Sequence, residues 1–303
     1  MKVGNRKAKF ALFRSVALVC AFVITSIARA EIVYLATSYD VIGYDSNGSN
    51  VFSWIVDVSP NGIAVDRTGN IFVSTGGSIE EMSTGGVVST FASGLGSPTG
   101  LAFDNNGNLY VSIANNQQID KIDTNGNVSL FSQIPVGGTK FFNAISLDSQ
   151  GNLYAGSVTH DLADSIMKID SNGNASTFVN NSVALGGTTV SGIACDAAGN
   201  VYVSYISGNL LKFTPDGSNS VFASGPGNGI AFDNSGNLFL SASFGEIDEF
   251  NSNGDMSVFV TGGNSPPNLR GIAVWDVPEP SSLLLAATGL LLLAAAVKRK
   301  RVS

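Results

Sequence analysis

The sequence predicts an all-β fold, specifically a six-bladed β-propeller of four-stranded antiparallel blades. Two observations predict it. A unit of about 40 residues with four short strand patterns recurs along the chain, as in propellers. In addition, the two ends of the repeating region, residues 31–276, hold complementary parts of one unit. A single four-stranded sheet cannot bury both of its faces, so neighbouring units must stack face to face.

The stretch Gly100–Phe131 shows the unit most clearly. Its β-forming segments fall at residues 100–104, 109–113, 119–122 and 128–131. The segments 104–108 and 123–127, rich in Asp, Asn and Gly, separate the first strand from the second and the third from the fourth. Asp and Asn bond to their own backbone, and Gly accepts a positive φ, so these segments are predicted to be tight turns.

Copies of this unit recur at regular intervals. Its first strand starts at residues 62, 100, 144, 192, 229 and 271, with spacings of 38, 44, 48, 37 and 42 residues. The second strand carries an aromatic residue at one register: Tyr34, Phe72, Tyr110, Tyr154, Tyr202 and Phe239. The fourth strand carries Phe52, Phe91, Phe131, Phe178, Phe222 and Phe259. We expect these rings to pack neighbouring blades against each other, because each removes a large apolar area from water.

The ends of the repeat region predict the number of blades. The N-terminal copy, residues 31–56, begins at the second strand of the unit, and the C-terminal copy, residues 271–275, holds only the first. Together they make one blade, which closes a ring of six. An open solenoid or a two-sheet sandwich is the alternative, but neither explains why the two half-units are complementary.

The repeated pattern G-[IL]-A-x-D-x-x-G-N-[LIV]-[YF]-V-S resembles that of NHL-repeat propellers. More loosely, it is similar to gluconolactonase and strictosidine synthase-like propellers. The resemblance covers residues 31–276 and implies the fold. It implies little about activity, because this fold hosts unrelated functions.

Residues 1–30 are predicted to be a signal peptide. A basic start is followed by the apolar stretch 16–27, which is short for a membrane span, and Ala28–Ala30 fits a signal-peptidase site. A lipoprotein site at Cys20 is a weaker alternative because Val19 is large and the apolar run continues past the cysteine. Cleavage before Glu31 leaves Cys195 as the sole cysteine of the mature body, so no disulfide is expected there. Because sister repeats carry Val or Phe at its position, we interpret Cys195 as a small buried apolar residue.

The C-terminal residues 277–303 are predicted to be a sorting signal. Pro278, Glu279 and Pro280 precede the apolar run 281–297, which is long enough for a short transmembrane helix, and the basic residues 298–301 follow. This order resembles a PEP-CTERM signal. The resemblance implies processing by an exosortase after signal peptidase, in a Gram-negative bacterium that makes exopolysaccharide. A simple C-terminal anchor is the alternative. Both interpretations place the propeller outside the cytoplasm: it faces the periplasm while anchored in the inner membrane, and it reaches the cell surface or the extracellular space after sorting.

Charge excludes one class of partner. Residues 31–276 contain six basic and 22 acidic residues, a net charge of −16. Such a surface repels nucleic acid and other polyanions. It attracts divalent cations weakly. Calcium ligation by the Asp-x-x-Gly-Asn turns is the other interpretation of their carboxylates, but these short turns lack the alternating ligands of a calcium loop. We therefore predict no cofactor, with calcium as the alternative.

The candidate ligand site is the funnel rim, defined by the residue before each first strand. Its six polar members are Asn61, Thr99, Asn143, Ser191, Asn228 and Arg270. The Asn-Gly pairs at 61–62 and 228–229 resemble metal-holding positions of calcium-dependent lactonase propellers, but the matching carboxylates are not found here. A long loop adds the candidates His160, Asp161 and Asp164, because binding residues often lie in loops of a rigid scaffold. No catalytic residue or metal ligand is assigned.

Two functions fit these observations. The first is an exported binding or structural module of the cell surface or matrix, without enzymatic activity, whose ligand is a glycan, exopolysaccharide or surface protein. The second is a lactonase- or lyase-type enzyme that uses a divalent cation in the funnel. Calcium binding by residues 31–277 distinguishes them.

Overall fold

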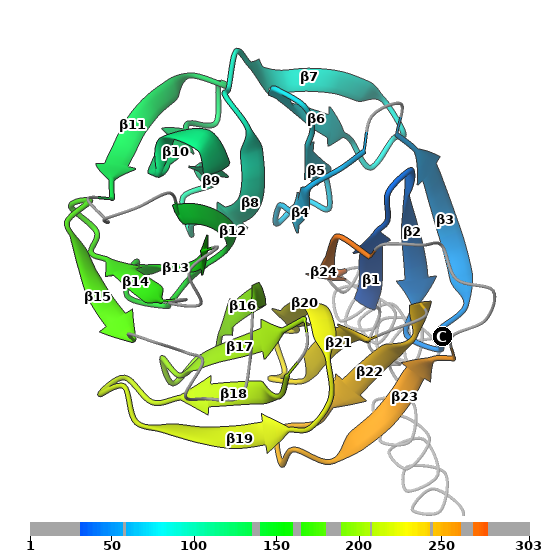
Figure 1. The fold of residues 1–303 in the computed structure, drawn as a ribbon. Helices are drawn as coiled ribbons and strands as arrows, with labels where there is room; N and C mark the ends of the chain where they lie inside the picture. The colour runs from blue at the N-terminus through cyan, green and yellow to red at the C-terminus, as the bar shows by residue number, and fades with distance from the viewer. Residues whose placement is uncertain are drawn as a thin grey trace, which may run out of the picture. The chain divides into compact units, whose positions relative to one another are not determined.

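Six four-stranded antiparallel sheets surround one axis in the computed structural model (Figure 1). The structure describes residues 31–56, 59–134, 140–159, 165–179, 189–206, 208–242, 245–261 and 269–277, and these belong to one compact unit, Glu31–Val277. The signal peptide predicted at 1–30 and residues 278–303 of the sorting signal lie outside the described residues. The predicted six-bladed propeller is confirmed.

Each blade runs from an inner strand at the axis to an outer strand at the circumference, and we call these strands A, B, C and D. Blade 1 consists of β24(Gly271–Asp276), β1(Glu31–Ala36), β2(Asp40–Asp45) and β3(Asn50–Ile55). Blade 2 consists of β4(Gly62–Val65), β5(Ile71–Ser74), β6(Ser78–Met82) and β7(Val88–Ser93). Blade 3 consists of β8(Pro98–Phe103), β9(Leu109–Ile113), β10(Gln118–Ile122) and β11(Val128–Gln133), with the 3-10 helix η1(Ala114–Asn116) between β9 and β10.

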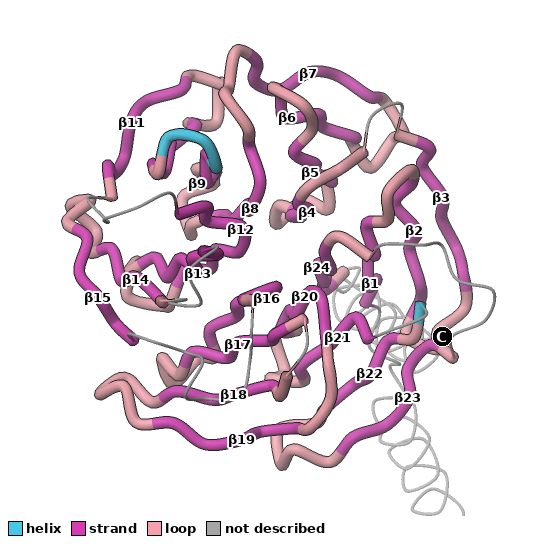
Figure 2. The backbone as a smooth tube through the Cα atoms, viewed as in Figure 1, coloured by secondary structure: helices cyan, strands magenta, loops and turns pink. Residues whose placement is uncertain are grey.

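The remaining blades repeat this order, as the strands in Figure 2 show. Blade 4 consists of β12(Lys140–Leu147), β13(Leu153–Thr159), β14(Ile166–Ile169) and β15(Ala175–Val179). Blade 5 consists of β16(Val190–Cys195), β17(Val201–Tyr205), β18(Leu210–Phe213) and β19(Asn219–Ala223). Blade 6 consists of β20(Gly227–Phe232), β21(Leu238–Ala242), β22(Ile247–Phe250) and β23(Met256–Val260). No helix among the described residues has the length and apolar character needed to span a membrane.

The two ends of the described chain join in blade 1. Strand β24 pairs antiparallel with β1 over six residues, from Glu31 opposite Asp276 to Ala36 opposite Gly271. The buried hydrophobic residues form six clusters, and each cluster combines side chains from two adjacent blades. One of them packs Val33 and Leu35 of blade 1 against Phe239 and Ile247 of blade 6. The predicted ring closure is therefore confirmed by both backbone pairing and core packing.

Glycine at the start of strand A allows the inner strands to approach one another. A Cβ atom on Gly62 would lie 2.2 Å from the carbonyl oxygen of Thr99 in the next blade. On Gly100, it would lie 2.8 Å from the carbonyl oxygen of Asn143. A buried serine in strand B completes the contact, since Ser74 Oγ donates a 2.6 Å hydrogen bond to the Thr99 carbonyl. The strand B serines thus support the inner strands, either across blades, as at Ser74 and Ser204, or within one blade, as at Ser112 and Ser241.

The aromatic residues pack both within and between blades. In every blade the ring on strand B contacts the ring on strand D of the same blade, with centroids 4.8–5.9 Å apart and edge-to-face geometry. Each such pair of rings also belongs to a hydrophobic cluster that includes side chains of the next blade, and Phe72 reaches the Phe103 ring there at 4.9 Å. The expected packing between blades is therefore confirmed, and the contact between the two rings of one blade adds to it.

Candidate functional site

The funnel rim lies around a narrow axial channel. Asn61, Asn143, Ser191 and Arg270 line a cavity of about 90 Å³ on the axis, together with the strand A glycines. Thr99, Asn143, Ser191 and Asn228 lie inside strands β8, β12, β16 and β20, where a β-bulge interrupts the pairing with strand B. A bulge re-aims a side chain. The structure therefore places four of the six rim residues in the inner strands, whereas Asn61 and Arg270 directly precede β4 and β24.

Three rim side chains bond to the next blade at one register. The Asn61 Nδ2 group donates to the carbonyl of Pro98 at 3.3 Å. The hydroxyl of Thr99 donates to the carbonyl of Phe142 at 2.7 Å, and that of Ser191 to the carbonyl of Gly227 at 2.6 Å. Each acceptor directly precedes a rim residue of the following blade. These side chains therefore hold adjacent inner strands together, and a ligand site at the rim stays a prediction.

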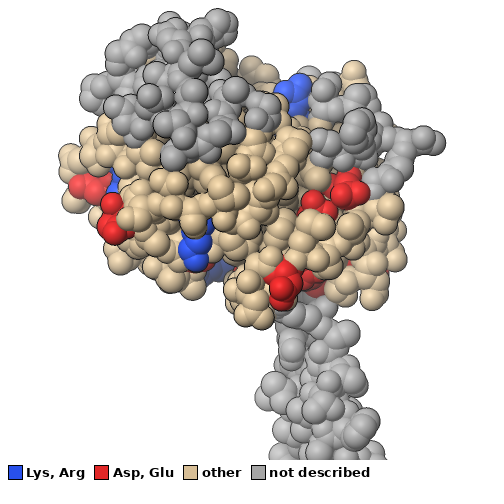
Figure 3. All heavy atoms as spheres, turned by 60° about the horizontal axis from the view of Figure 1, so that its bottom comes forward, with Lys and Arg blue, Asp and Glu red and all other residues tan. Residues whose placement is uncertain are grey.

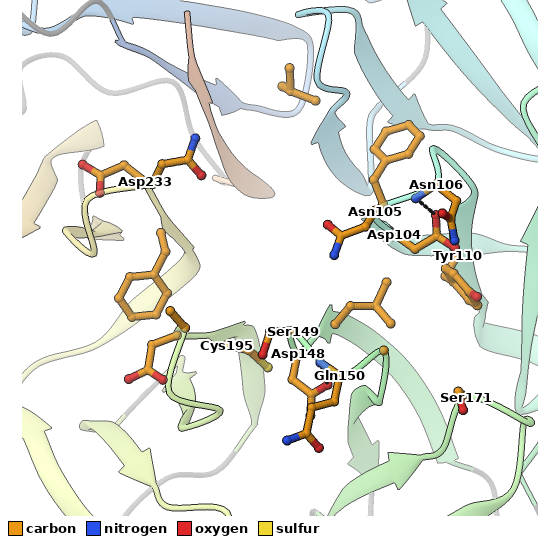
Figure 4. Close-up of a pocket in the computed structure, with 18 of the residues that line it drawn as sticks. Asp104, Asn105, Asn106, Tyr110, Asp148, Ser149, Gln150, Ser171, Cys195 and Asp233 are labelled. Carbon is orange, nitrogen blue, oxygen red and sulfur yellow. Dashed lines mark hydrogen bonds between the residues drawn. The ribbon is translucent and has the colours of Figure 1, made fainter. Parts of the chain in front are cut away.

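A much larger cavity opens where the A–B turns meet around the axis. Its volume is about 880 Å³, and residues of blades 3, 4, 5 and 6 line most of it. We call it the turn-face cavity. Figure 4 shows Asp104, Asn105 and Asn106 on one side of its open centre and Asp233 across it. From the sequence these turns are predicted to be structural, and the repeat pattern alone does not indicate a cavity at this face.

The apolar lining of the turn-face cavity comes from the last residue of each strand A. These residues directly precede the turn aspartates, and they are Val65, Phe103, Leu147, Cys195 and Phe232. All five are half-buried. They provide an apolar surface at the mouth of the channel. The variable position in the repeated Gly-Ile-Ala-x-Asp pattern was the signal that could have located it.

The carboxylates of the A–B turns accept hydrogen bonds from other groups of the same turn. Asp104 Oδ1 accepts hydrogen bonds from the backbone N–H groups of Asn106 and Asn108, at 2.8 and 2.9 Å, and its Oδ2 accepts one from Asn108 Nδ2 at 2.7 Å. The same three bonds recur at Asp148, Asp196 and Asp233. Burial alone would raise the pKa of the Asp104 carboxyl, but these bonds and the charge of Lys121 lower it overall. All four carboxyl groups therefore organise their own turns through these hydrogen bonds.

Neutral polar side chains line the rest of the cavity. They occupy the middle of the turns or the turn next to them: Asn105, Asn106, Ser149, Gln150, Ser171 and Asn234. Amide and hydroxyl groups both donate and accept hydrogen bonds, which suits a hydroxyl-rich ligand. The cavity thus combines an apolar surface with neutral hydrogen-bonding groups.

Three consecutive blades add a lysine over a tyrosine ring. The Nζ atoms of Lys121, Lys168 and Lys212 lie 5.4, 5.5 and 5.3 Å from the ring centroids of Tyr110, Tyr154 and Tyr202. Of these six residues, Lys121 and Tyr110 line the turn-face cavity. Burial raises the pKa of Tyr154, and the Asp148 carboxylate raises it further. Burial also raises the pKa of Tyr202, so Tyr154 and Tyr202 stay protonated at neutral pH and act as neutral hydrogen-bonding groups.

Cys195 lies at the edge of this cavity as a free, half-buried thiol. Burial raises the pKa of its thiol to about 12, and the carboxylates of Asp148 and Asp196 contribute to the increase. Since the thiolate is the reactive form, this cysteine is a poor nucleophile. The interpretation of Cys195 as a small apolar residue fits its chemistry, although it is less buried than we expected.

The other candidates cannot be placed. His160, Asp161 and Asp164 lie outside the described residues, as do Pro278, Glu279 and Pro280. Within the described part of the chain, no group of three or more His, Cys, Asp or Glu residues is arranged to hold a metal ion. The assignment of no cofactor, and the calcium alternative, therefore stay predictions.

Comparison with known proteins identifies a sorting signal and the fold. Residues 276–300 match the PEP-CTERM protein-sorting motif, which indicates an exported protein. No curated protein sequence matches the chain significantly.

Solved propellers resemble the structure at low sequence identity. A virginiamycin B lyase from Staphylococcus aureus is 16% identical, with a TM-score of 0.54, over 74% of this chain and 78% of its own. A gluconolactonase from Xanthomonas campestris is 18% identical, with a TM-score of 0.57, over 68% and 76%. A calcium-binding regucalcin from Agrobacterium tumefaciens is 16% identical, with a TM-score of 0.55, over 65% and 72%. At these identities the likeness shows the fold alone.

Proposed function

We propose that this chain is an exported propeller of the cell surface or extracellular matrix that binds a glycan and does not transform it. Its sorting motif supports export, and the host predicted for such a signal makes exopolysaccharide. Signal peptidase and an exosortase would process the chain, which the C-terminal helix would hold in the inner membrane until sorting. Exopolysaccharide is therefore the ligand class that the protein would meet after export.

The observation that carries this proposal is the lining of the turn-face cavity. A sugar ring has apolar C–H faces and hydroxyl groups along its edge. The cavity offers matching groups, with Phe103 and Phe232 among its apolar residues and Asn105, Gln150 and Asn234 among its amides. Its volume of about 880 Å³ is also within the range of small-ligand sites. The funnel rim at the axial channel is the second candidate surface for the same ligand.

A metal-dependent lactonase or lyase is the alternative function. Propellers named as a gluconolactonase, a virginiamycin B lyase and a calcium-binding protein share the fold, which favours a test of this activity. In this chain the carboxylates of the four turn aspartates of the cavity accept hydrogen bonds from their own turns, and the Cys195 thiol is protonated at neutral pH. Titration calorimetry of residues 31–277 with calcium decides between the two functions. A dissociation constant in the millimolar range or weaker would exclude the metal-dependent enzyme.

The proposal is tested by a polysaccharide-binding screen of residues 31–277. Binding should fall at least about tenfold when Asn105, Gln150 and Asn234 are changed to alanine, because each change removes hydrogen bonds to the sugar. The matched set Asn61→Ala, Asn143→Ala and Asn228→Ala removes the same kind of side chain from the rim. Equal binding by the cavity variants and the unaltered protein would show that the glycan does not bind in the turn-face cavity. Loss in the rim set alone would place it at the channel.

A further inference from the structure

The outer strand of blade 1 ends in an exposed apolar patch. Ile55, the last residue of β3, is 77% exposed, and Tyr39 in the turn before β2 is 70% exposed. The backbone N–H of Val56 donates to the carbonyl of Tyr39 at 2.9 Å, so the two exposed side chains come from adjacent backbone segments. Large apolar side chains that face water side by side on a soluble protein commonly mark an interaction surface.

A cavity lies directly beside Ile55, between blades 1 and 2. Its volume is about 500 Å³, and Trp54, Val56 and Val88 give it apolar walls. Gly76 and Gly77 leave one side without side chains. We call Tyr39, Ile55 and this cavity the β3 patch.

Glu80 is the charged residue in the lining of this cavity. Ser78 Oγ donates to Glu80 Oε1 at 2.7 Å, and Thr90 Oγ1 donates to Glu80 Oε2 at 3.0 Å. Both oxygens of the carboxylate thus have a partner within the protein. The cavity therefore does not need a basic ligand, and an aliphatic side chain fits its walls.

Within the described part of the chain, the edge of β3 carries none of the usual protection. Strand β3 is the last strand of its sheet, so its outward backbone groups lack a strand partner among the described residues. Its sequence, Asn50–Ile55, has no charged residue and no proline. Natural sheets normally block such an edge with lysine, proline or a covering segment. The outer strands of the other blades are also uncharged, and Figure 3 shows how few charged atoms interrupt the visible wall of the described blades.

We propose that two copies of the chain dimerise through the β3 patch. Each Ile55 would enter the cavity of the other copy around a two-fold axis near the end of β3. A surface that holds both the projecting side chain and the cavity is complementary to itself, which is the property that a two-fold interface requires. This inference goes beyond glycan binding and does not depend on it.

Charge favours a second copy over a foreign partner. With a net charge of −16 for residues 31–276, a basic partner would bind where carboxylates gather. Two copies repel each other through the same carboxylates and approach most easily where few charges lie, as along β3, whose own residues are uncharged and whose neighbour Glu80 is held by Ser78 and Thr90. Because salt screens that repulsion, the dimer should become tighter as salt increases. A complex with a basic partner would become weaker.

The first experiment measures self-association of residues 31–277, the compact unit with its own closed ring and cores. The patch is smaller than a standard interface, so we expect a dissociation constant on the order of 100 μM. Sedimentation velocity should show a dimer that strengthens from about 0.05 M to about 0.5 M salt. Ile55→Lys should abolish it. Leu130→Lys should leave the dimer intact, because Leu130 is 59% exposed on the equivalent strand β11 but lies outside the β3 patch.

The second experiment uses the symmetry of the proposed contact. A cysteine at a two-fold axis lies next to its own copy, so Ile55→Cys should form a disulfide-linked dimer under mild oxidation. Leu130→Cys and the unaltered protein, whose Cys195 thiol is poorly reactive, should remain monomeric on a non-reducing gel. A monomer at about 1 mM in high salt would overturn the proposal. Equal cross-linking through Ile55→Cys and Leu130→Cys would also overturn it, since the outer edges would then associate without specificity.

Discussion

Asp248 is expected to make the stability of the propeller depend on pH. This residue lies in β22, is only 8% exposed, and has no hydrogen-bond partner at Oδ1. Burial, together with the charge of the nearby Glu246 carboxyl and a side-chain hydrogen bond to it, raises the pKa of the Asp248 carboxyl to about 6. Strand pairing places Asp248 opposite the apolar residues Leu240 and Val258.

The sign and size of the effect follow from the two pKa values. An aspartate in the unfolded chain titrates near pH 3.9, about two units below the folded value. Between about pH 4 and about pH 6, the unfolded chain loses a proton that the folded chain keeps, so the free energy of unfolding falls as pH rises. Two units correspond to about 3 kcal/mol at most. We expect about 1–2 kcal/mol, because water near the surface screens part of the burial cost.

Replacing Asp248 by asparagine tests this reasoning. Urea unfolding, followed by the fluorescence of Trp54 and Trp275, gives the free energy of unfolding for both proteins from about pH 4 to about pH 7.5. In the difference between the two free energies of unfolding, the contributions of the other carboxyl groups cancel. Asp248→Asn should be more stable than the unaltered protein by about 1–2 kcal/mol above pH 6, and this advantage should vanish near pH 4.

Asp120 provides the matched control on β10. It is also buried, and burial raises its pKa, but Gln118 Nε2 donates a 2.9 Å hydrogen bond to its Oδ1 and opposes the increase. Asp120→Asn should therefore give a smaller gain. A difference between Asp248→Asn and the unaltered protein that stays constant across this pH range would refute the assignment of the raised pKa to Asp248.

Three other predictions follow from the inner strands and the turn-face cavity. Gly62→Ala should lower the free energy of unfolding by more than about 2 kcal/mol because its Cβ would meet the Thr99 carbonyl at 2.2 Å, whereas Gly76→Ala, with no atom within 4 Å, should change it by less than about 1 kcal/mol in urea unfolding. Ending the chain at residue 270 removes β24 and exposes the clusters on both sides of blade 1, so calorimetry should show a lower and broader thermal transition. At pH 8, Cys195 should react with a disulfide reagent about a thousandfold more slowly than in the urea-unfolded chain, because a pKa of about 12 leaves little thiolate.

The fold was predictable from the sequence because its determinants are local and repeated. The Gly-Ile-Ala-x-Asp strand, the Asp-x-x-Gly-Asn turn and the Val-Ser end of strand B each recur at one register. Each carries a contact that the structure shows, from the Gly62 approach to the Ser74 hydrogen bond. The two complementary half-blades at the ends of residues 31–276 then predicted that the ring closes, without any knowledge of contacts between distant residues. The contact between the B-strand ring and the D-strand ring of one blade was less predictable than the packing between blades, because a bulge in each C–D pair shifts the register that brings the two rings together.

The rim illustrates why the site was harder to predict than the fold. Six polar residues at one register suggested a ligand site, yet Thr99 and Ser191 use their hydroxyls to bond the next inner strand. A polar side chain beside the axis can either bind a ligand or donate a hydrogen bond to the next blade. The sequence does not show whether a carbonyl of that blade lies within reach. That distance depends on how closely the inner strands approach, which the neighbouring glycine sets.

The turn-face cavity follows from the same construction, applied at the opposite end of the inner strands. Glycine holds the strands close at their start, but their ends at Phe103, Leu147 and Phe232 carry large side chains that keep the strands apart. Each turn then uses its aspartate for its own hydrogen bonds and adds neutral polar side chains to the opening. In one repeat the Asp-x-x-Gly-Asn motif only forms a turn, but around the axis the turns of several repeats together form the polar lining of a cavity. The cavity is a property of the ring, and for that reason no single repeat could reveal it.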